Sequence, residues 1–169
     1  MTNQNEQLSL SRPQNLQTAF SEIQIDAKLI EKNEQFEMHS LLLAAEDDYQ
    51  GRTTFVNLAY VNDLSDEESN LALLQYFTEL PVMIEEGQQQ LMETLLNFVN
   101  IRMPLGHFCT QNNKVYLRYV LAESKRDENY AMKTIETFFM FVDVMDIFQS
   151  SIEQIISGNL TYEAFKSKF

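Results

Sequence analysis

The 169-residue sequence predicts one α+β domain, a twisted antiparallel sheet with helices packed on one face. Three observations support this prediction. The length is that of an ordinary single domain. Two pairs of strand-like segments are joined by short turns, which is typical of antiparallel hairpins. Segments with helical periodicity precede, separate and follow these strands, so the expected order is helix, strands, helix, hairpin and long helix.

The N-terminal part is predicted to be a flexible arm over residues 1–11, followed by the domain over residues 12–169. The arm is polar and offers little to bury. Pro13 suits the first turn of a helix, and apolar residues then recur at helical spacing to about residue 22. Residues 23–31 fit both a helical and an alternating pattern, so both alternatives remain open.

The next segments are rich in strand-forming residues. Residues 36–46 and 53–62 form a predicted hairpin, because Asp47, Asp48 and Gly51 supply turn chemistry between them. A third strand is expected over residues 71–80, ended by Pro81.

The second half of the chain is predicted to contain two long helices around another hairpin. The first helix is expected from residue 84 or 85 to residue 102. Strands over residues 107–111 and 115–122 meet at Asn112 and Asn113, which tolerate the positive φ of a tight turn. A long helix over residues 127–157 and a short tail helix over residues 160–169 complete the chain.

The charge balance excludes nucleic acid first among partner classes. The chain has 12 basic and 25 acidic residues, a formal charge of −13, and no basic stripe that would bind phosphates. Residues 1–101 hold 4 basic and 17 acidic side chains, whereas residues 102–169 hold 8 of each. This division predicts an acidic side and a neutral side if the two parts occupy different sides of the fold.

Composition also favours a cytoplasmic protein with no membrane partner. No apolar run approaches the roughly 20 residues that span a bilayer. The first residues lack the basic and apolar segments of a signal peptide. The single cysteine, Cys109, fits a reducing compartment.

Side-chain chemistry predicts no catalytic, metal or cofactor site. His39 and His107 lack an evident partner, and one cysteine with one neighbouring histidine falls short of the four ligands of a structural zinc site. Cys109 is expected to be a buried, inert thiol. Catalysis would require these three residues, or several carboxylates, to converge in the fold.

The long helix is apolar nearly all round between residues 138 and 148. One face of a surface helix cannot bury so many apolar residues, so this helix is predicted to be sandwiched or to form an interface. The candidates for an interface or partner groove are Phe138, Phe141, Met145 and Phe148. Their burial in the core is an equally weighted alternative.

A motif lies between the two halves of the predicted domain. A helix ending in Asn-x-Arg leads through Pro-Leu-Gly-x-Phe into a hairpin whose return strand contains Val-Tyr-x-Arg, over residues 100–118. Its signature residues are Arg102, Pro104, Leu105, Gly106, Phe108 and Arg118. The motif resembles the central signature of YbjN-type domains, which are similar to the Tir-type chaperones of type III secretion. The resemblance extends over about residues 70–160.

This resemblance implies a non-enzymatic, homodimeric module that holds an extended segment of a partner protein. Apolar contacts and strand addition would hold the segment, and the acidic surface favours a basic client. Of the signature residues, Pro104 and Gly106 would form a corner, Leu105 and Phe108 would fill the core, and Arg118 would pair with an acid or a helix end. YbjN-type proteins are also described as regulators of sensory transduction, and the alternative function is binding of a small ligand between sheet and long helix.

Overall fold

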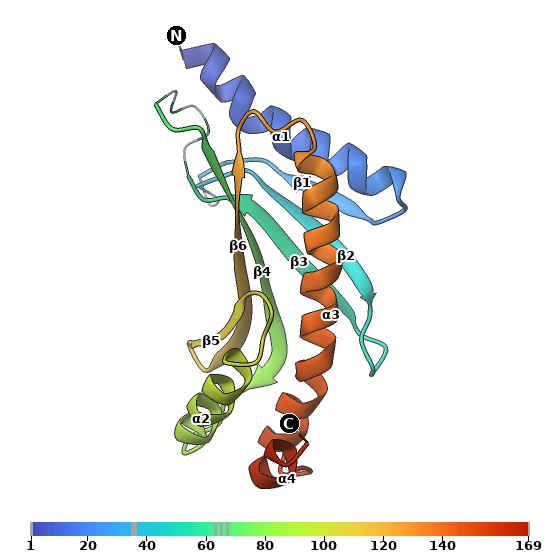
Figure 1. The fold of residues 1–169 in the computed structure, drawn as a ribbon, viewed down its shortest axis with the longest axis vertical. Coiled ribbons are helices and arrows are strands. Elements are labelled where there is room, and N and C mark those ends of the chain that lie inside the picture. The colour runs from blue at the N-terminus through green and yellow to red at the C-terminus, as the bar shows by residue number, and fades with distance from the viewer. Residues whose placement is uncertain (1, 35–36, 63, 65, 67, 169) are drawn as a thin grey trace.

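The protein folds into an antiparallel sheet flanked by helices (Figure 1). The structure is a computed structural model that describes residues 2–34, 37–62, 64, 66 and 68–168. The elements in chain order are α1 (Thr2–Glu22), β1 (Ala27–Ile30), β2 (Ser40–Asp47), β3 (Thr53–Tyr60), β4 (Leu71–Met83), α2 (Gln89–Asn100), β5 (His107–Gln111), β6 (Lys114–Ser124), α3 (Tyr130–Ile156) and α4 (Tyr162–Lys166). The predicted α+β class and order of elements are confirmed.

The six strands are arranged in the order β1-β2-β3-β4-β6-β5, with every neighbouring pair antiparallel. Both predicted hairpins are confirmed. Asn112 and Asn113 connect β5 to β6 with φ angles of 52° and 61°, the left-handed conformation that a tight hairpin turn requires. The β2–β3 hairpin contains a register shift between Ala44 and Asp47.

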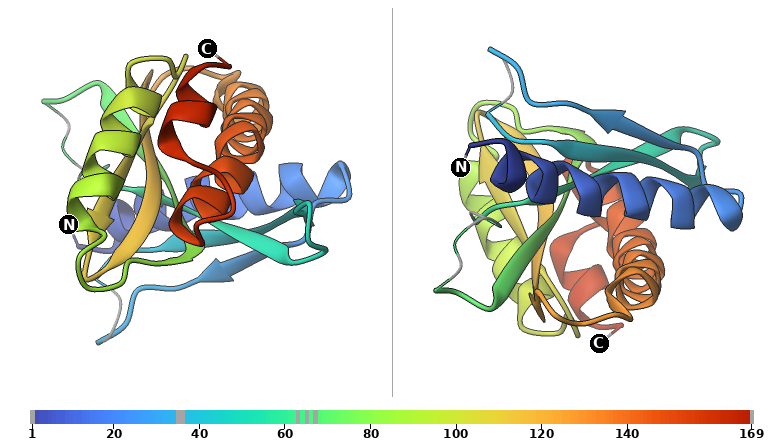
Figure 2. Two further views of the ribbon diagram at one scale, coloured as in Figure 1. Left: turned by 90° about the horizontal axis from the view of Figure 1, so that it is seen from below. Right: turned by 90° about the horizontal axis from the view of Figure 1, so that it is seen from above.

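The helices and one face of the sheet enclose a single core. α3 runs along the concave side of the twisted sheet, while α1 crosses one end of the molecule and α2 and α4 lie at the other (Figures 1 and 2). Aromatic rings join these layers. The ring centroids of Tyr76 on β4 and Phe141 on α3 lie 5.8 Å apart, and those of Phe20 on α1 and Phe138 on α3 lie 5.3 Å apart.

The N-terminal helix is longer than predicted. α1 begins at Thr2 and includes residues 2–11, for which the sequence predicted a flexible arm, and Pro13 lies inside it. Proline interrupts one backbone hydrogen bond and does not by itself decide where a helix begins. The ambiguous segment that follows contains a strand, β1, whose Leu29 is registered with Leu41 of β2.

Two predicted boundaries near Pro81 were wrong. β4 continues through Pro81 to Met83. Proline has no N–H, but none is needed at this position, because Pro81 lies within a register shift on the β6 side, between Glu79 and Met83, and beyond the last registered pair on the β3 side. α2 begins at Gln89, not at residue 84 or 85, because the Ile84 N–H donates to the Asn113 carbonyl oxygen (2.8 Å) and extends the sheet.

An ion pair fastens α1 to β6. Arg12 Nη1 donates to Glu123 Oε1 (2.8 Å), and the Arg12 guanidinium lies 4.2 Å from the ring centroid of Tyr130. The Tyr60 hydroxyl donates to the same Glu123 oxygen (3.0 Å). Glu123 Oε2 is buried and has no hydrogen-bond partner among the described residues. Burial raises the pKa of Glu123, although Tyr60 and Arg12 act in the opposite direction.

The acidic and neutral parts of the chain are interleaved in space, so the predicted separation into two sides was wrong. Ion pairs join the two parts at Arg12–Glu123, Arg52–Glu153 and Lys114–Glu79. The physical reason is the topology, since β6 follows residue 101 yet pairs along most of β4. In the described part of the chain, no helix is long and apolar enough to cross a membrane.

Candidate protein-binding surface

The outer face of the sheet, opposite the core, carries apolar side chains. Along β4, the even-numbered residues from Ala72 to Val82 are buried, whereas the odd-numbered residues from Leu71 to Met83 are half-buried or exposed. Antiparallel sheets with a solvated face normally place polar residues there. The outer patch is defined by the apolar residues Leu42, Phe55, Leu71, Leu73, Phe77, Tyr116 and Val120 on this face.

Side chains from three strands form the centre of the outer patch. Phe77 on β4 stacks on Tyr116 on β6, with ring centroids 5.0 Å apart and an interplanar angle of 24°. Phe55 on β3 is 52% exposed. None of the three rings belongs to the core cluster or packs against it. The patch is thus a surface on which further apolar area can be buried.

β3 and β4 separate beside the outer patch. Their register runs only from the Asn57–Phe77 pair to the Tyr60–Leu74 pair, after which β4 has β6 as its only registered neighbour among the described residues. The Thr78 hydroxyl donates to the Phe55 carbonyl oxygen (2.8 Å) at the point of separation. The segment from residue 79 to residue 83 is called the open edge of β4.

The backbone direction at the open edge follows from the ladder pattern. The Val61 N–H donates to the Leu73 carbonyl oxygen (2.9 Å), so Leu73 directs its backbone groups toward β3. In antiparallel pairing, alternate residues face the same neighbour, so Glu79 directs its N–H and C=O toward the gap. Glu79 therefore offers both backbone groups to an added strand, whereas Pro81, two positions further on, has no N–H to donate.

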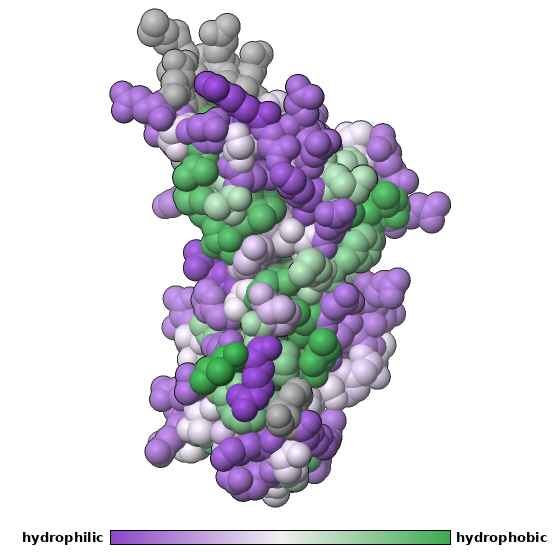
Figure 3. Space-filling view, in the orientation of Figure 1, coloured by the Kyte–Doolittle hydropathy of each residue, from purple (hydrophilic) through white to green (hydrophobic). Residues whose placement is uncertain are grey.

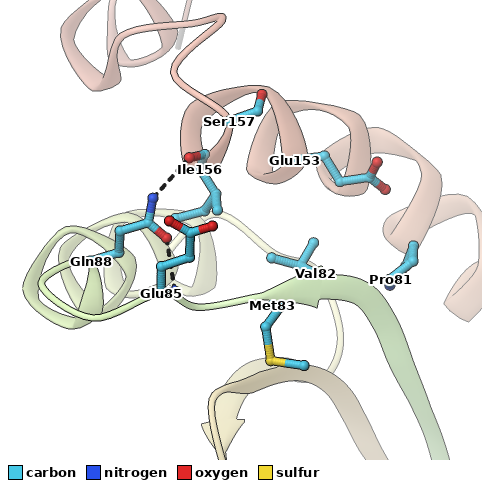
Figure 4. Close-up of a pocket in the computed structure, with 8 residues that line it drawn as sticks. All are labelled: Pro81, Val82, Met83, Glu85, Gln88, Glu153, Ile156 and Ser157. Carbon is cyan, nitrogen blue, oxygen red and sulfur yellow. Dashed lines mark hydrogen bonds between the residues drawn. The ribbon is translucent and has the colours of Figure 1, made fainter.

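A cleft of about 490 Å³ lies between the open edge and the end of α3 (Figure 4). Its lining residues are Pro81, Val82, Met83, Glu85, Gln88, Glu153, Ile156 and Ser157. Gln88 Nε2 donates to the Ile156 carbonyl oxygen (3.0 Å), and the Gln88 Oε1 atom accepts from the Glu85 N–H (2.9 Å). These bonds tie the start of α2 to the end of α3 and hold the wall of the cleft.

A charged cluster holds the β2–β3 hairpin on α3 and so helps to set the gap between β3 and β4. Arg52 Nη2 lies 2.6 Å from both Asp48 Oδ2 and Glu153 Oε1. Asp48 also accepts from the N–H groups of Gln50 (2.8 Å) and Arg52 (3.0 Å) and from Gln149 Nε2 (2.9 Å). Burial alone would raise the pKa of Asp48, but the bonds from Arg52 and Gln50 outweigh it and lower the pKa to about 2.

The signature motif builds the corner between α2 and β5. The Asn100 side chain accepts from the Phe108 N–H (2.7 Å) and donates to the Phe108 carbonyl oxygen (3.0 Å). Gly106 has a φ of +71°, and a Cβ there would lie 2.9 Å from the Arg118 carbonyl oxygen. Only glycine fits this corner without strain.

The other signature residues have structural contacts. Phe108 is buried, with its ring centroid 6.4 Å from that of Phe148, and Leu105 packs against the core. Pro104 is exposed in the corner. Arg102 donates to the Phe98 carbonyl oxygen (2.9 Å) at the end of α2. The Nε of Arg118 donates to the Gln75 side chain (2.6 Å) on the outer face, not to an acid or a helix end.

The four residues of α3 that were candidates for an interface or partner groove lie in the core. Burial in the core was the alternative that the sequence left open. Phe138, Phe141, Met145 and Phe148 are at most 4% exposed. The sandwiched position of α3 explains this burial, because sheet, α1 and α2 contact it from several sides. These residues are unavailable to a partner, so we no longer assign them to an interface or groove.

The three residues considered for catalysis do not converge. His39 precedes β2, whereas His107 and Cys109 lie on β5, and β3, β4 and β6 separate these two strands. The His39 Nδ1 atom accepts from the Lys32 N–H (3.0 Å). Burial raises the pKa of the half-buried Cys109 thiol. No group of three or more potential metal ligands occurs among the described residues.

The outer patch and the open edge were not predicted from the sequence, although the patch had a detectable signal. Residues 71–77 are apolar in both phases of the strand alternation, with Leu71, Leu73 and Phe77 in one phase and Leu74 and Tyr76 in the other. A strand with one solvated face would be apolar in one phase only. The open edge has no such signal, because it depends on where β3 diverges.

Together these features define an α+β protein whose antiparallel sheet exposes an apolar face and an open strand edge. Comparisons with protein-family models, curated proteins and solved structures found no match. The resemblance to YbjN-type domains stays a prediction, and the function is argued from the surface itself.

Proposed function

We propose that this protein is a non-enzymatic module that holds an extended segment of a partner protein at the open edge of β4. The observation that carries this proposal is the separation of β3 and β4 beyond Phe77, next to the apolar outer patch. A strand added at such an edge gains affinity from main-chain hydrogen bonds and specificity from alternate side chains. One set of those side chains would lie over the outer patch.

The charge near the site favours a basic segment. Glu85 lines the cleft beside Glu153, which is already paired with Arg52, and the chain carries a net charge of −13. Complementary charge increases the rate of encounter and disfavours acidic competitors. We further propose that the protein acts in the cytoplasm as a homodimer, as the resemblance to secretion chaperones implies. Sedimentation velocity at micromolar concentration tests the dimer, and a monomer would contradict it.

The test of segment binding uses peptides selected from a phage-displayed library of random 12-residue sequences. A selected peptide is synthesised with and without N-methyl groups at alternate backbone positions, and binding is measured by fluorescence anisotropy. We expect N-methylation to abolish binding, because it removes the main-chain donors but keeps every side chain. Hydrogen exchange should show protection of the Glu79 and Met83 amides in the complex.

Two exposed residues provide a matched pair of variants. Phe55→Gln should lower the affinity for the selected peptide at least fivefold. Ile101→Gln should leave the affinity unchanged, because Ile101 is 74% exposed on a remote corner. Equal binding of the N-methylated peptide, or protection confined to residues outside β3 and β4, would refute segment addition.

The cleft favours a second candidate function, binding of a small ligand between the sheet and the end of α3. Away from the cleft, the space between the sheet and α3 is filled by core side chains such as Tyr76 and Phe141, which are fully buried. Because Arg52 already pairs with Glu153, it is the carboxylate of Glu85 that favours a cationic ligand such as a polyamine. Titration of ¹⁵N-labelled protein with spermidine should shift the Glu85 and Ser157 amides, and saturable shifts only at other residues would reject this candidate.

A further inference from the structure

α3 exposes a second, separate set of apolar residues on the side that faces away from the core. Met132, Phe139, Met140 and Ile147 are between 47% and 60% exposed. Their neighbours on this face are Glu136, Asp143 and Asp146, also exposed. The space-filling view shows hydrophobic and hydrophilic residues alternating along the course of α3 (Figure 3).

The two kinds of residue recur with a period of seven. Phe139 follows Met132 by seven positions, and Ile147 follows Met140 by seven. Asp143 follows Glu136 by the same interval, so apolar and acidic layers alternate along one line of the helix. A seven-residue period keeps one face of a helix against a second helix over several turns. From residue 132 to residue 147 the line extends about 22 Å.

The acidic layers identify the chemistry of that second helix. Partial burial is the main cause that raises the pKa of Asp146, and the nearby carboxylates of Asp143, Asp48 and Glu46 act in the same direction. The one basic residue on the adjoining part of the helix, Lys133, forms an ion pair with Asp127. A partner must therefore supply the positive charge.

We propose that the outward face of α3 docks an amphipathic helix of a partner protein that alternates apolar and Lys or Arg residues along a seven-residue repeat. A second copy of this chain does not fit, because twofold apposition of the face would oppose acidic layers with acidic layers. An anionic membrane surface is disfavoured by the same charges. This docking site is independent of the open edge, so the two proposals can fail separately.

The test uses a synthetic 21-residue helix of three heptads with Leu and Lys at alternate core positions, and a matched peptide with Glu in place of Lys. We expect the Lys peptide to bind and to shift amides between residues 132 and 147, and the Glu peptide not to bind. Asp143→Lys should lower the affinity for the Lys peptide at least tenfold and allow the Glu peptide to bind. Glu93→Lys, at an exposed position on α2, is the charge-matched control and should change neither.

Four results would overturn the proposal. One is equal binding of the Lys peptide to wild type and Asp143→Lys, and another is amide shifts that lie elsewhere. The third is a wild-type dimer in sedimentation whose α3 amides are protected, since a second copy would then cover the face. Binding of wild type to phosphatidylglycerol vesicles through Phe139 and Ile147 would also contradict it, in favour of a lipid surface.

Discussion

Asp48 and Glu123 are both buried carboxylates paired with an arginine, yet their pKa values shift in opposite directions. Each side chain is 2% exposed. Asp48 accepts from two backbone N–H groups, from Arg52 and from Gln149, whereas Glu123 accepts from Arg12 and Tyr60 at one oxygen only. Burial disfavours the charged form in both cases, and the number of donors, not the presence of an arginine, decides whether that penalty is outweighed.

The two carboxylates also act on different parts of the molecule. Glu123 and Arg12 fasten α1 to β6, away from the open edge. Asp48, through Arg52 and Glu153, fastens the β2–β3 hairpin to α3 beside the gap between β3 and β4. Loss of Asp48 should therefore affect both stability and segment binding, whereas loss of Glu123 should affect stability alone.

The largest expected effect is that of Asp48→Asn. The variant places an amide group among N–H donors and removes the charge that Arg52 compensates, so the free energy of unfolding should fall by about 3 kcal/mol. Glu123→Gln should change it by less than about 1 kcal/mol, because the pKa of Glu123 is already raised. Urea unfolding at pH 7, followed by circular dichroism, measures both, and equal losses would contradict the comparison.

An intermediate effect is expected for Arg12→Met. This variant leaves the Glu123 charge buried without its cation and should cost about 2 kcal/mol at pH 7. The double variant Arg12→Met/Glu123→Gln should recover most of that loss, because a neutral amide replaces the uncompensated charge. By contrast, adding Asp48→Asn to Arg52→Met should not restore the lost free energy of unfolding, because Glu153 still lacks its partner Arg52. Recovery of Arg52→Met by Asp48→Asn would show that the two clusters are equivalent.

The pH dependence of stability has opposite signs for the two groups. The pKa of Asp48 is about 2 in the folded state against an ordinary 3.8, so its contribution is present above pH 3.8 and lost as the pH falls toward 2. The pKa of Glu123 is raised above 4.5, so stability falls as the pH rises from 4.5 through the folded pKa.

Unfolding of wild type and Glu123→Gln between pH 3 and pH 7 isolates the second contribution. The variant should lack the fall at higher pH, so its stability should not decrease between pH 4.5 and pH 7 as that of wild type does. A profile that is unchanged by Glu123→Gln would mean that Tyr60 and Arg12 offset the burial of this carboxylate completely.

Local turn chemistry made much of the fold predictable. Asn112 and Asn113 indicated the second hairpin because few residue pairs tolerate two positive φ angles. Pro81 led to a wrong strand boundary, because proline excludes only positions whose N–H must pair, and among the described residues β4 has no registered partner on the β3 side there. The start of α2 was misplaced because Ile84 bonds to Asn113, a residue 29 positions away that local patterns cannot reveal.

The candidate surface was much less predictable than the fold. Phe141 and Phe139 have the same chemistry and lie two positions apart, yet one is fully buried and the other is 47% exposed. A helix that is apolar all round has no intrinsic inner side, so only the packing of the sheet, α1 and α2 determines which residues remain for a partner.

The Asn100 side chain affects whether the edge strand β5 can pair with a strand of another chain. Its amide satisfies both the N–H and the C=O of Phe108 on β5, the last strand of the sheet at that end. An approaching strand would have to displace it before pairing there. Asn100 thus works against edge-to-edge linkage of β5 with other chains, the route by which sheets grow into fibres.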